Sequence, residues 1–253
     1  MDQATDQKTL ARVNLNAVFR TLELLPDYDD QTRQLLNGVS EIIQFTTPPS
    51  TIRLAIHDGT ITFHPGSGPN TMNLVLPSAK AVNKLFDGSG TPIPVKGITK
   101  IKFLTGPFTQ LTDRLTEYLR PSQANLADPE FSRANSAMTL HVAAYALAEI
   151  GNSDKQGKLN AARIPDGDIL LAVTDGPQLT VRAQGGHLSV RREPATQWRA
   201  KMVFADIDSA GQILRGEMSS YAAIGKGLIE LGGLIPMLDE LNKLLGLVPK
   251  YLS

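Results

Sequence analysis

The sequence predicts two α+β domains in tandem, each with an antiparallel or mixed sheet and helices on one face. Three observations support this fold class. Segments typical of helices and of strands alternate along the chain, and the second half repeats the order of the first. The 253 residues also suffice for two domains of about 120 residues, each with its own core. Polar residues between Pro121 and Pro129 indicate the boundary between the domains. The first domain is expected to cover residues 1–122 and the second residues 123–253.

The first half opens with apolar residues at helical spacing from Leu10 to Leu25, and Pro26 is expected to end this helix. A second short helix is expected over 29–36. The next segments alternate apolar and polar residues and predict strands: 40–46, a hairpin over 51–63, and 72–76. Ser78 can cap a helix to Gly88, residues 98–104 are expected to form a strand, and Pro107 starts a last helix.

The second half repeats this order with similar lengths. The expected elements are a helix over 132–150, a loop rich in Gly, Asn and Lys, a strand over 168–174, a hairpin over 179–190, a strand over 200–204, a helix capped by Asp206 or Asp208 and ending at Gly216, a strand over 228–231, and a helix from Pro236 through Leu245.

The two halves also align residue by residue. An offset of 127 places Ile52 on Leu179, and an offset of 128 places Leu74 on Met202. The second offset also places Ile101 on Ile229. Apolar character, glycines and turns keep their register although few residues are identical, which favours a duplicated domain.

Two segments of the second half carry a family resemblance. Residues 200–216, AKMVFADIDSAGQILRG, read as a strand, an acidic helix cap, an apolar helix and a glycine stop, and residues 225–233, GKGLIELGG, read as a strand between glycines. This pattern resembles the sterol carrier protein type-two superfamily. The resemblance implies a curved five-stranded sheet covered on one face by helices, with an apolar tunnel between them for fatty acyl chains, sterols or similar lipids. The first half matches more loosely, because Thr99 and Thr105 stand where the second half has glycine.

The tunnel that the resemblance implies selects the candidate ligand-binding residues. They are apolar, as burial of a lipid chain requires at about 0.8 kcal/mol per methylene, and they include the adaptable side chain of methionine. Tyr221 can offer a hydroxyl to a ligand headgroup. The candidates are Phe204, Ile213, Leu214, Met218, Tyr221, Ile224, Met237, Leu241, Leu244 and Leu245. For any one of them, ordinary core packing is the more common explanation.

The residue inventory argues against several kinds of chemistry. The chain has no cysteine, no Gly-x-Ser-x-Gly nucleophile motif and no histidine pair at zinc-ligand spacing. We therefore predict no catalytic residue, no metal site and no cofactor. Lysine plus arginine equals aspartate plus glutamate at 25 each, so bulk attraction to a nucleic acid is not expected.

The expected partner is a hydrophobic small molecule or a lipid. Residues 1–10 lack the apolar core of a signal peptide, and no apolar run reaches the ~18 residues of a membrane span, so a cytoplasmic protein is expected. The loop from Arg191 to Arg199 contains Trp198 and can touch anionic headgroups, although a solvated hairpin end explains it as well. A transient membrane contact and a homodimer are left open.

The sequence thus predicts a protein that binds and transfers a lipid-like ligand without catalysis. One alternative is an interaction or scaffold protein whose tunnel is filled by side chains. Another is an enzyme, or the accessory domain of one, that acts on an acyl or polycyclic substrate. The sequence does not name the ligand, and the first half is the weaker candidate for binding it.

Overall fold

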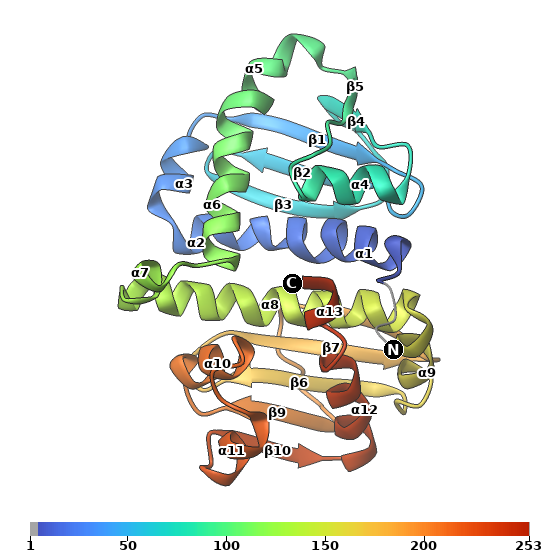
Figure 1. Ribbon diagram of the computed structural model, residues 1–253, viewed down its shortest axis with the longest axis vertical. Helices are drawn as coiled ribbons and strands as arrows, with labels where there is room; N and C mark the ends of the chain where they lie inside the picture. The colour runs from blue at the N-terminus through green and yellow to red at the C-terminus, as the bar shows by residue number, and fades with distance from the viewer. Residues whose placement is uncertain (1–4, 253) are drawn as a thin grey trace. The chain divides into compact units, whose positions relative to one another are not determined.

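The computed structural model describes residues 5–252, and the chain divides into two compact units, one up to Arg120 and one from Pro121 (Figure 1). The first unit contains α1 (Gln7–Val13), η1 (Asn14–Val18), η2 (Phe19–Leu24), α2 (Leu25–Tyr28), α3 (Asp30–Leu35), β1 (Ser40–Thr46), β2 (Ile52–His57), β3 (Thr60–Pro65), β4 (Met72–Val75), α4 (Ala79–Phe86), β5 (Ile93–Lys96), η3 (Ile98–Lys100), α5 (Ile101–Phe103), η4 (Leu104–Phe108) and α6 (Thr109–Leu119).

The second unit repeats the alternation of helices and strands. It contains α7 (Gln123–Leu126), α8 (Pro129–Ser153), α9 (Lys155–Ala161), β6 (Gly167–Val173), β7 (Gln178–Gln184), β8 (His187–Arg191), β9 (Ala200–Phe204), α10 (Ile207–Leu214), α11 (Ser220–Gly225), β10 (Ile229–Gly233), α12 (Ile235–Leu245) and α13 (Pro249–Leu252).

Each unit has one five-stranded mixed sheet, and the two sheets have the same topology. The strand orders are β3-β2-β1-β4-β5 and β8-β7-β6-β9-β10. In each sheet one central pair is parallel, β1 with β4 and β6 with β9, and the other neighbours are antiparallel. The predicted α+β class with two five-stranded sheets covered by helices is confirmed.

Strand register agrees with the alignment of the two halves. Ile52 pairs with Phe45 in the first sheet, and its aligned partner Leu179 pairs with Leu171 in the second. Side chains of directly paired residues lie on the same face of a sheet. These aligned residues, and Leu74 with Met202, therefore occupy corresponding positions in the two sheets. The alignment of Ile101 with Ile229 is wrong, because Ile101 lies on helix α5 and Ile229 in strand β10.

The helix-covered face of the second sheet forms the core of its unit. Alternate residues of all five strands are buried there, because strand side chains point to opposite faces in turn. They are Ile169, Leu171, Val173, Leu179, Val181, Ala183, Leu188, Val190, Ala200, Met202, Phe204 and Ile229. Helix α8 contacts β7 and β8, and α10 and α12 both contact β9. The opposite face exposes residues such as Arg182 and Ser189.

The strand predicted over 98–104 is wrong. Residues 98–108 form helical turns, and the edge strand β5 lies just before them at Ile93–Lys96. The three- and four-residue spacing of Ile98, Ile101, Leu104 and Phe108 fits a helix better than a strand. Pro94, which lacks an N–H, is tolerated in β5 because this is an edge strand.

Helices α9 and α11 of the second unit were not predicted, and neither were the four-residue helices α7 and α13. Helix α9 occupies the expected loop after 150, and the Asp154 side chain caps it by accepting a hydrogen bond from the Gly157 N–H at 2.8 Å. Helix α11 lies in the connection before β10, capped by Ser219. Both are short, so capping and packing stabilise them more than a long apolar repeat does.

Candidate functional site

The predicted ligand-binding residues fall into three groups by exposure. Phe204, Met237, Leu241 and Leu244 are buried, and the last three have no solvent-accessible surface at all. Ile213, Leu214, Met218 and Leu245 are half-buried. Tyr221 and Ile224 are exposed, to 85% and 44%.

The structure brings the four buried candidates and the half-buried pair Ile213 and Leu214 together around strand β9. Phe204 ends β9, and α12, which carries the three fully enclosed residues, contacts β9. Helix α10, which carries Ile213 and Leu214, contacts β9 as well. Since Met237, Leu241 and Leu244 have zero accessible surface, no water-sized space adjoins them. A ligand that reaches them has to displace protein atoms.

The apolar sheet face continues past its helix cover at β10. Leu231 pairs with Met202 and therefore lies on the helix-covered face, yet Leu231 is 40% exposed and Met202 only 9%. Helix α11 contacts β10, and of its residues only Ala223 is buried. We call the exposed residues Leu231 on β10 and Tyr221 and Ile224 on the contacting helix α11 the β10 rim.

Glu240 is a residue that the sequence argument missed. Glu240 is 8% exposed. It lies on the same side of α12 as Met237, three residues before it, and Leu244, four residues after it. Its Oε1 accepts a hydrogen bond from Lys243 Nζ at 2.8 Å, whereas Oε2 is buried without a hydrogen-bond partner in the described structure. A buried unpaired acceptor is costly, so Oε2 would favour a donor group. The helical spacing alone was sufficient to place Glu240 near the core.

In the first unit, aromatic rings fill the corresponding space. Phe19 lies 5.0 Å from Phe45 and 4.4 Å from Phe86 between ring centroids, and Phe108 lies 6.1 Å from Phe45. Phe86 aligns with Leu214, one of the predicted ligand-binding residues. These rings join the helices η2, α4 and η4 to strand β1.

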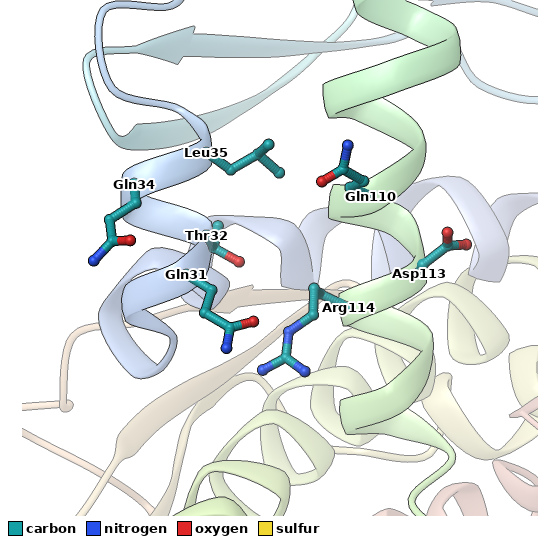
Figure 2. Close-up of a pocket in the computed structure, with 7 residues that line it drawn as sticks. All are labelled: Gln31, Thr32, Gln34, Leu35, Gln110, Asp113 and Arg114. Atoms are coloured by element: carbon teal, nitrogen blue, oxygen red, sulfur yellow. The ribbon is translucent and has the colours of Figure 1, made fainter.

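A groove of about 420 Å³ lies in the first unit, where no site was predicted. Figure 2 shows its side chains, which come from α3 and α6: Gln31, Thr32, Gln34, Leu35, Gln110, Asp113 and Arg114. Only Leu35 is apolar. The amide and charged groups suit a polar ligand better than a lipid chain. No sequence motif indicates this groove, because its two groups of lining residues, on α3 and on α6, are 75 or more positions apart and of ordinary surface type.

The charge of Arg114 in this groove is already paired. Arg114 Nη2 donates to Asp29 Oδ1 at 2.6 Å, Arg114 Nη1 donates to Glu117, and the guanidinium lies 5.2 Å from the centroid of the Tyr118 ring. Burial opposes ionisation of Asp29, but hydrogen bonds from Arg114 and Thr32 outweigh it and lower the pKa of Asp29. The ion pair between Arg114 on α6 and Asp29, which caps α3, links these two helices.

Arg191 and Arg199, at the two ends of the loop, are likewise hydrogen-bonded within their own unit, to Asp168 and to the Asp166 carbonyl oxygen. Asp168 accepts hydrogen bonds from Arg182 Nε and from Arg191 Nη2, both at 2.7 Å. The Arg182 hydrogen bond, with Arg191 adding to it, lowers the pKa of Asp168 against the effect of burial. Trp198 is 40% exposed, and Lys201 Nζ lies 5.6 Å from its ring centroid. These contacts fit a solvated hairpin end.

Two further features bear on chemistry and on membranes. Within residues 5–252, no three His, Asp or Glu side chains gather in a way that suits a metal ion. In the same part of the chain, every helix is too short or too polar to cross a bilayer.

Among known proteins, this chain is similar to several solved structures. No family model and no curated protein matches the sequence. Among solved structures, a ubiquinone synthesis protein, UbiJ-SCP2, is 16% identical over 41% of this chain and 85% of its own, with a TM-score of 0.33. Sterol carrier protein domain 2 of Helicoverpa armigera is 14% identical over 44% and 89%, with a TM-score of 0.36.

A third structure, sterol carrier protein 2, is 20% identical over 42% of this chain and 92% of its own, with a TM-score of 0.33. The solved structures to which this chain is similar thus include sterol carrier proteins, the family that the sequence resembles. At these identities and TM-scores, none of the three assigns a ligand or an activity to this chain.

Proposed function

We propose that this protein binds a hydrophobic, lipid-like ligand non-covalently through its second unit and releases it without chemical change. The observation that carries the proposal is the apolar face of the second sheet, which runs from the buried core at Met202 to the exposed β10 rim at Leu231. Such a face stabilises an apolar ligand by removing its surface from water.

The half-buried residues between rim and core give the ligand its route. Ile213, Leu214 and Met218 keep accessible surface on and just after α10, whereas α12 is closed against the core. In this proposal the ligand enters at the β10 rim, contacts α10, and reaches Met237 and Leu241 by moving α11 or α12. Gly227 lies just after α11 and Gly233 just before α12, and their φ values are +72° and +87°.

The scaffold alternative draws on one specific observation. Met237, Leu241 and Leu244 have no accessible surface, as expected of a tunnel that side chains have filled. In that case the β10 rim is a contact surface for another protein and takes up no small ligand. The two functions differ in whether an apolar probe binds with saturation.

The test combines extraction and titration of the full chain. Lipid extracted from mildly purified protein is identified by mass spectrometry, and a fluorescent fatty acid is titrated into delipidated protein. We expect a co-purifying lipid or saturable binding of the probe. The absence of both would reject the proposal and leave the scaffold alternative.

A pair of charged substitutions locates the site. Met218→Glu places a carboxylate beside the proposed route in the second unit, and Leu35→Glu does the same in the groove of the first unit, where the replaced side chain is also half-buried. Met218→Glu is expected to weaken probe binding at least about tenfold because burial of a carboxylate is costly. Leu35→Glu is expected to leave the affinity unchanged. The reverse result would move the site to the first unit.

A further inference from the structure

The first unit carries four exposed aliphatic residues close together in the chain, at the β5 edge of its sheet. Ile93 and Val95 are each 54% exposed, Ile98 is 63% exposed and Ile101 is 46% exposed. They lie on β5, η3 and α5, which follow one another directly along the chain beyond β4 (Figure 1). Single exposed hydrophobic residues are common on soluble proteins, but a contiguous patch indicates an interaction site.

The charges in this region are of one sign. From Gly88 to Thr112 the chain has no aspartate or glutamate, and it has three lysines, Lys96, Lys100 and Lys102. Lys100 pairs with Glu41 at 2.7 Å, and the Lys96 ammonium donates a hydrogen bond to the Asn70 carbonyl oxygen, which leaves its charge uncompensated by an acid.

Lys102 is exposed to solvent next to Ile101. We call the four aliphatic residues and the three lysines together the β5 surface. It combines apolar side chains with a net positive charge.

The edge strand itself is poorly suited to pairing with a strand of another protein. Pro94 has no N–H to donate, and Val95 stands at an irregularity where β5 shifts register against β4, so that Leu74 pairs with Pro94 and Asn73 with Lys96. Bulges and prolines are features that protect sheet edges from strand addition. A partner that needs no backbone pairing therefore fits this surface better.

We propose that the β5 surface docks on an anionic lipid bilayer. Aliphatic side chains enter the boundary between headgroups and acyl chains, and lysines beside them are attracted to the negative surface potential of the lipid. Glu41 forms an ion pair with Lys100, so Lys96 and Lys102 are the lysines proposed to interact with the headgroups. This docking does not depend on ligand binding by the second unit.

Co-sedimentation of the full chain with vesicles tests the proposal. Vesicles of phosphatidylcholine alone are compared with vesicles containing 30 mol% phosphatidylglycerol, at roughly 0.05 M and 0.5 M salt. We expect binding to the phosphatidylglycerol vesicles at low salt, at least about tenfold weaker binding at high salt, and weak binding to phosphatidylcholine.

Two double variants separate the apolar and the ionic contributions. Ile93→Ser with Ile98→Ser is expected to weaken binding at least tenfold. Lys96→Gln with Lys102→Gln is expected to weaken it about fivefold per lysine. The matched controls lie on α9 of the second unit: Leu159→Ser, where leucine is 52% exposed, and Lys155→Gln with Lys158→Gln. The controls should bind vesicles like the natural sequence.

Three results would overturn the proposal. They are no binding to phosphatidylglycerol vesicles at low salt, equal loss of binding in the controls, and binding of polyglutamate but not of vesicles, which would indicate an acidic protein partner. The fluorescent fatty acid should bind the β5-surface variants as it binds the natural sequence. Loss of vesicle binding with unchanged probe affinity therefore distinguishes this proposal from that for the second unit.

Discussion

Asp29 is a buried carboxylate whose ionisation stabilises the first unit. It caps α3 by accepting from the Thr32 N–H at 2.9 Å and pairs with Arg114 on α6, and it is 5% exposed. Asn at this position can still cap the helix, so Asp29→Asn removes the charge and keeps the cap. We expect the variant to lower the free energy of unfolding at neutral pH by about 1–3 kcal/mol.

This loss depends on pH in a defined direction. Because the fold lowers the pKa of Asp29 from its ordinary value of 3.8, the stabilisation is fully present above that value and is lost as the pH falls through the lowered folded pKa. The difference between the natural protein and Asp29→Asn should be constant above about pH 5 and shrink at acidic pH. Urea unfolding of both proteins from roughly pH 2 to 7 measures it.

Asp30→Asn is the matched control, since the Asp30 side chain is 76% exposed and pairs only at the surface with Arg33. It should change stability by less than about 0.5 kcal/mol at any pH. An equal effect of both variants would show that the pair with Arg114 contributes little.

At the scale of secondary-structure elements, a buried hydrogen bond joins the last helix, α13, to the start of α9. The Tyr251 hydroxyl on α13 donates to Asp154 Oδ2 at 2.6 Å, and Asp154 also caps α9. Tyr251→Phe removes the donor and leaves a buried carboxylate oxygen short of a partner. We expect a loss of about 1.5–3 kcal/mol in the free energy of unfolding, measured by urea denaturation.

The control is Tyr221→Phe, whose side chain is 85% exposed on α11 and should tolerate the change within about 0.5 kcal/mol. If Tyr251→Phe is as harmless as this control, α13 is held by its apolar contacts and the hydrogen bond is dispensable.

At the scale of the whole molecule, two compact units predict two folding units. The chain should therefore be separable near Arg120 into fragments that each unfold cooperatively in urea. The fragment covering residues 121–253 should bind the fluorescent fatty acid with an affinity within about twofold of the full chain, because the proposed site lies in it. A fragment that unfolds without cooperativity, or binds only when the other is present, would contradict this independence. The assignment of both units as sterol-carrier-like domains stays a prediction.

Local signals in the sequence were sufficient for most of the fold. Strands β1, β2, β4, β7 and β9, the Ser78 cap and helix α12 follow from alternation, turn residues and helical spacing, which depend on neighbours in the chain. Residues 98–104 were assigned wrongly because lysines between apolar residues fit both a strand and a helix, and only packing against the sheet decides between the two.

The sequence by itself determined that the protein has two α+β units with the same order of elements, and that apolar residues concentrate around β9, α10 and α12 of the second. Tertiary structure decided which of those residues touch solvent. It encloses Met237 and Leu241, leaves Tyr221 exposed, and fills the first core with the rings of Phe19 and Phe45. Exposure depends on contacts between residues far apart in the chain, and local sequence patterns do not record them.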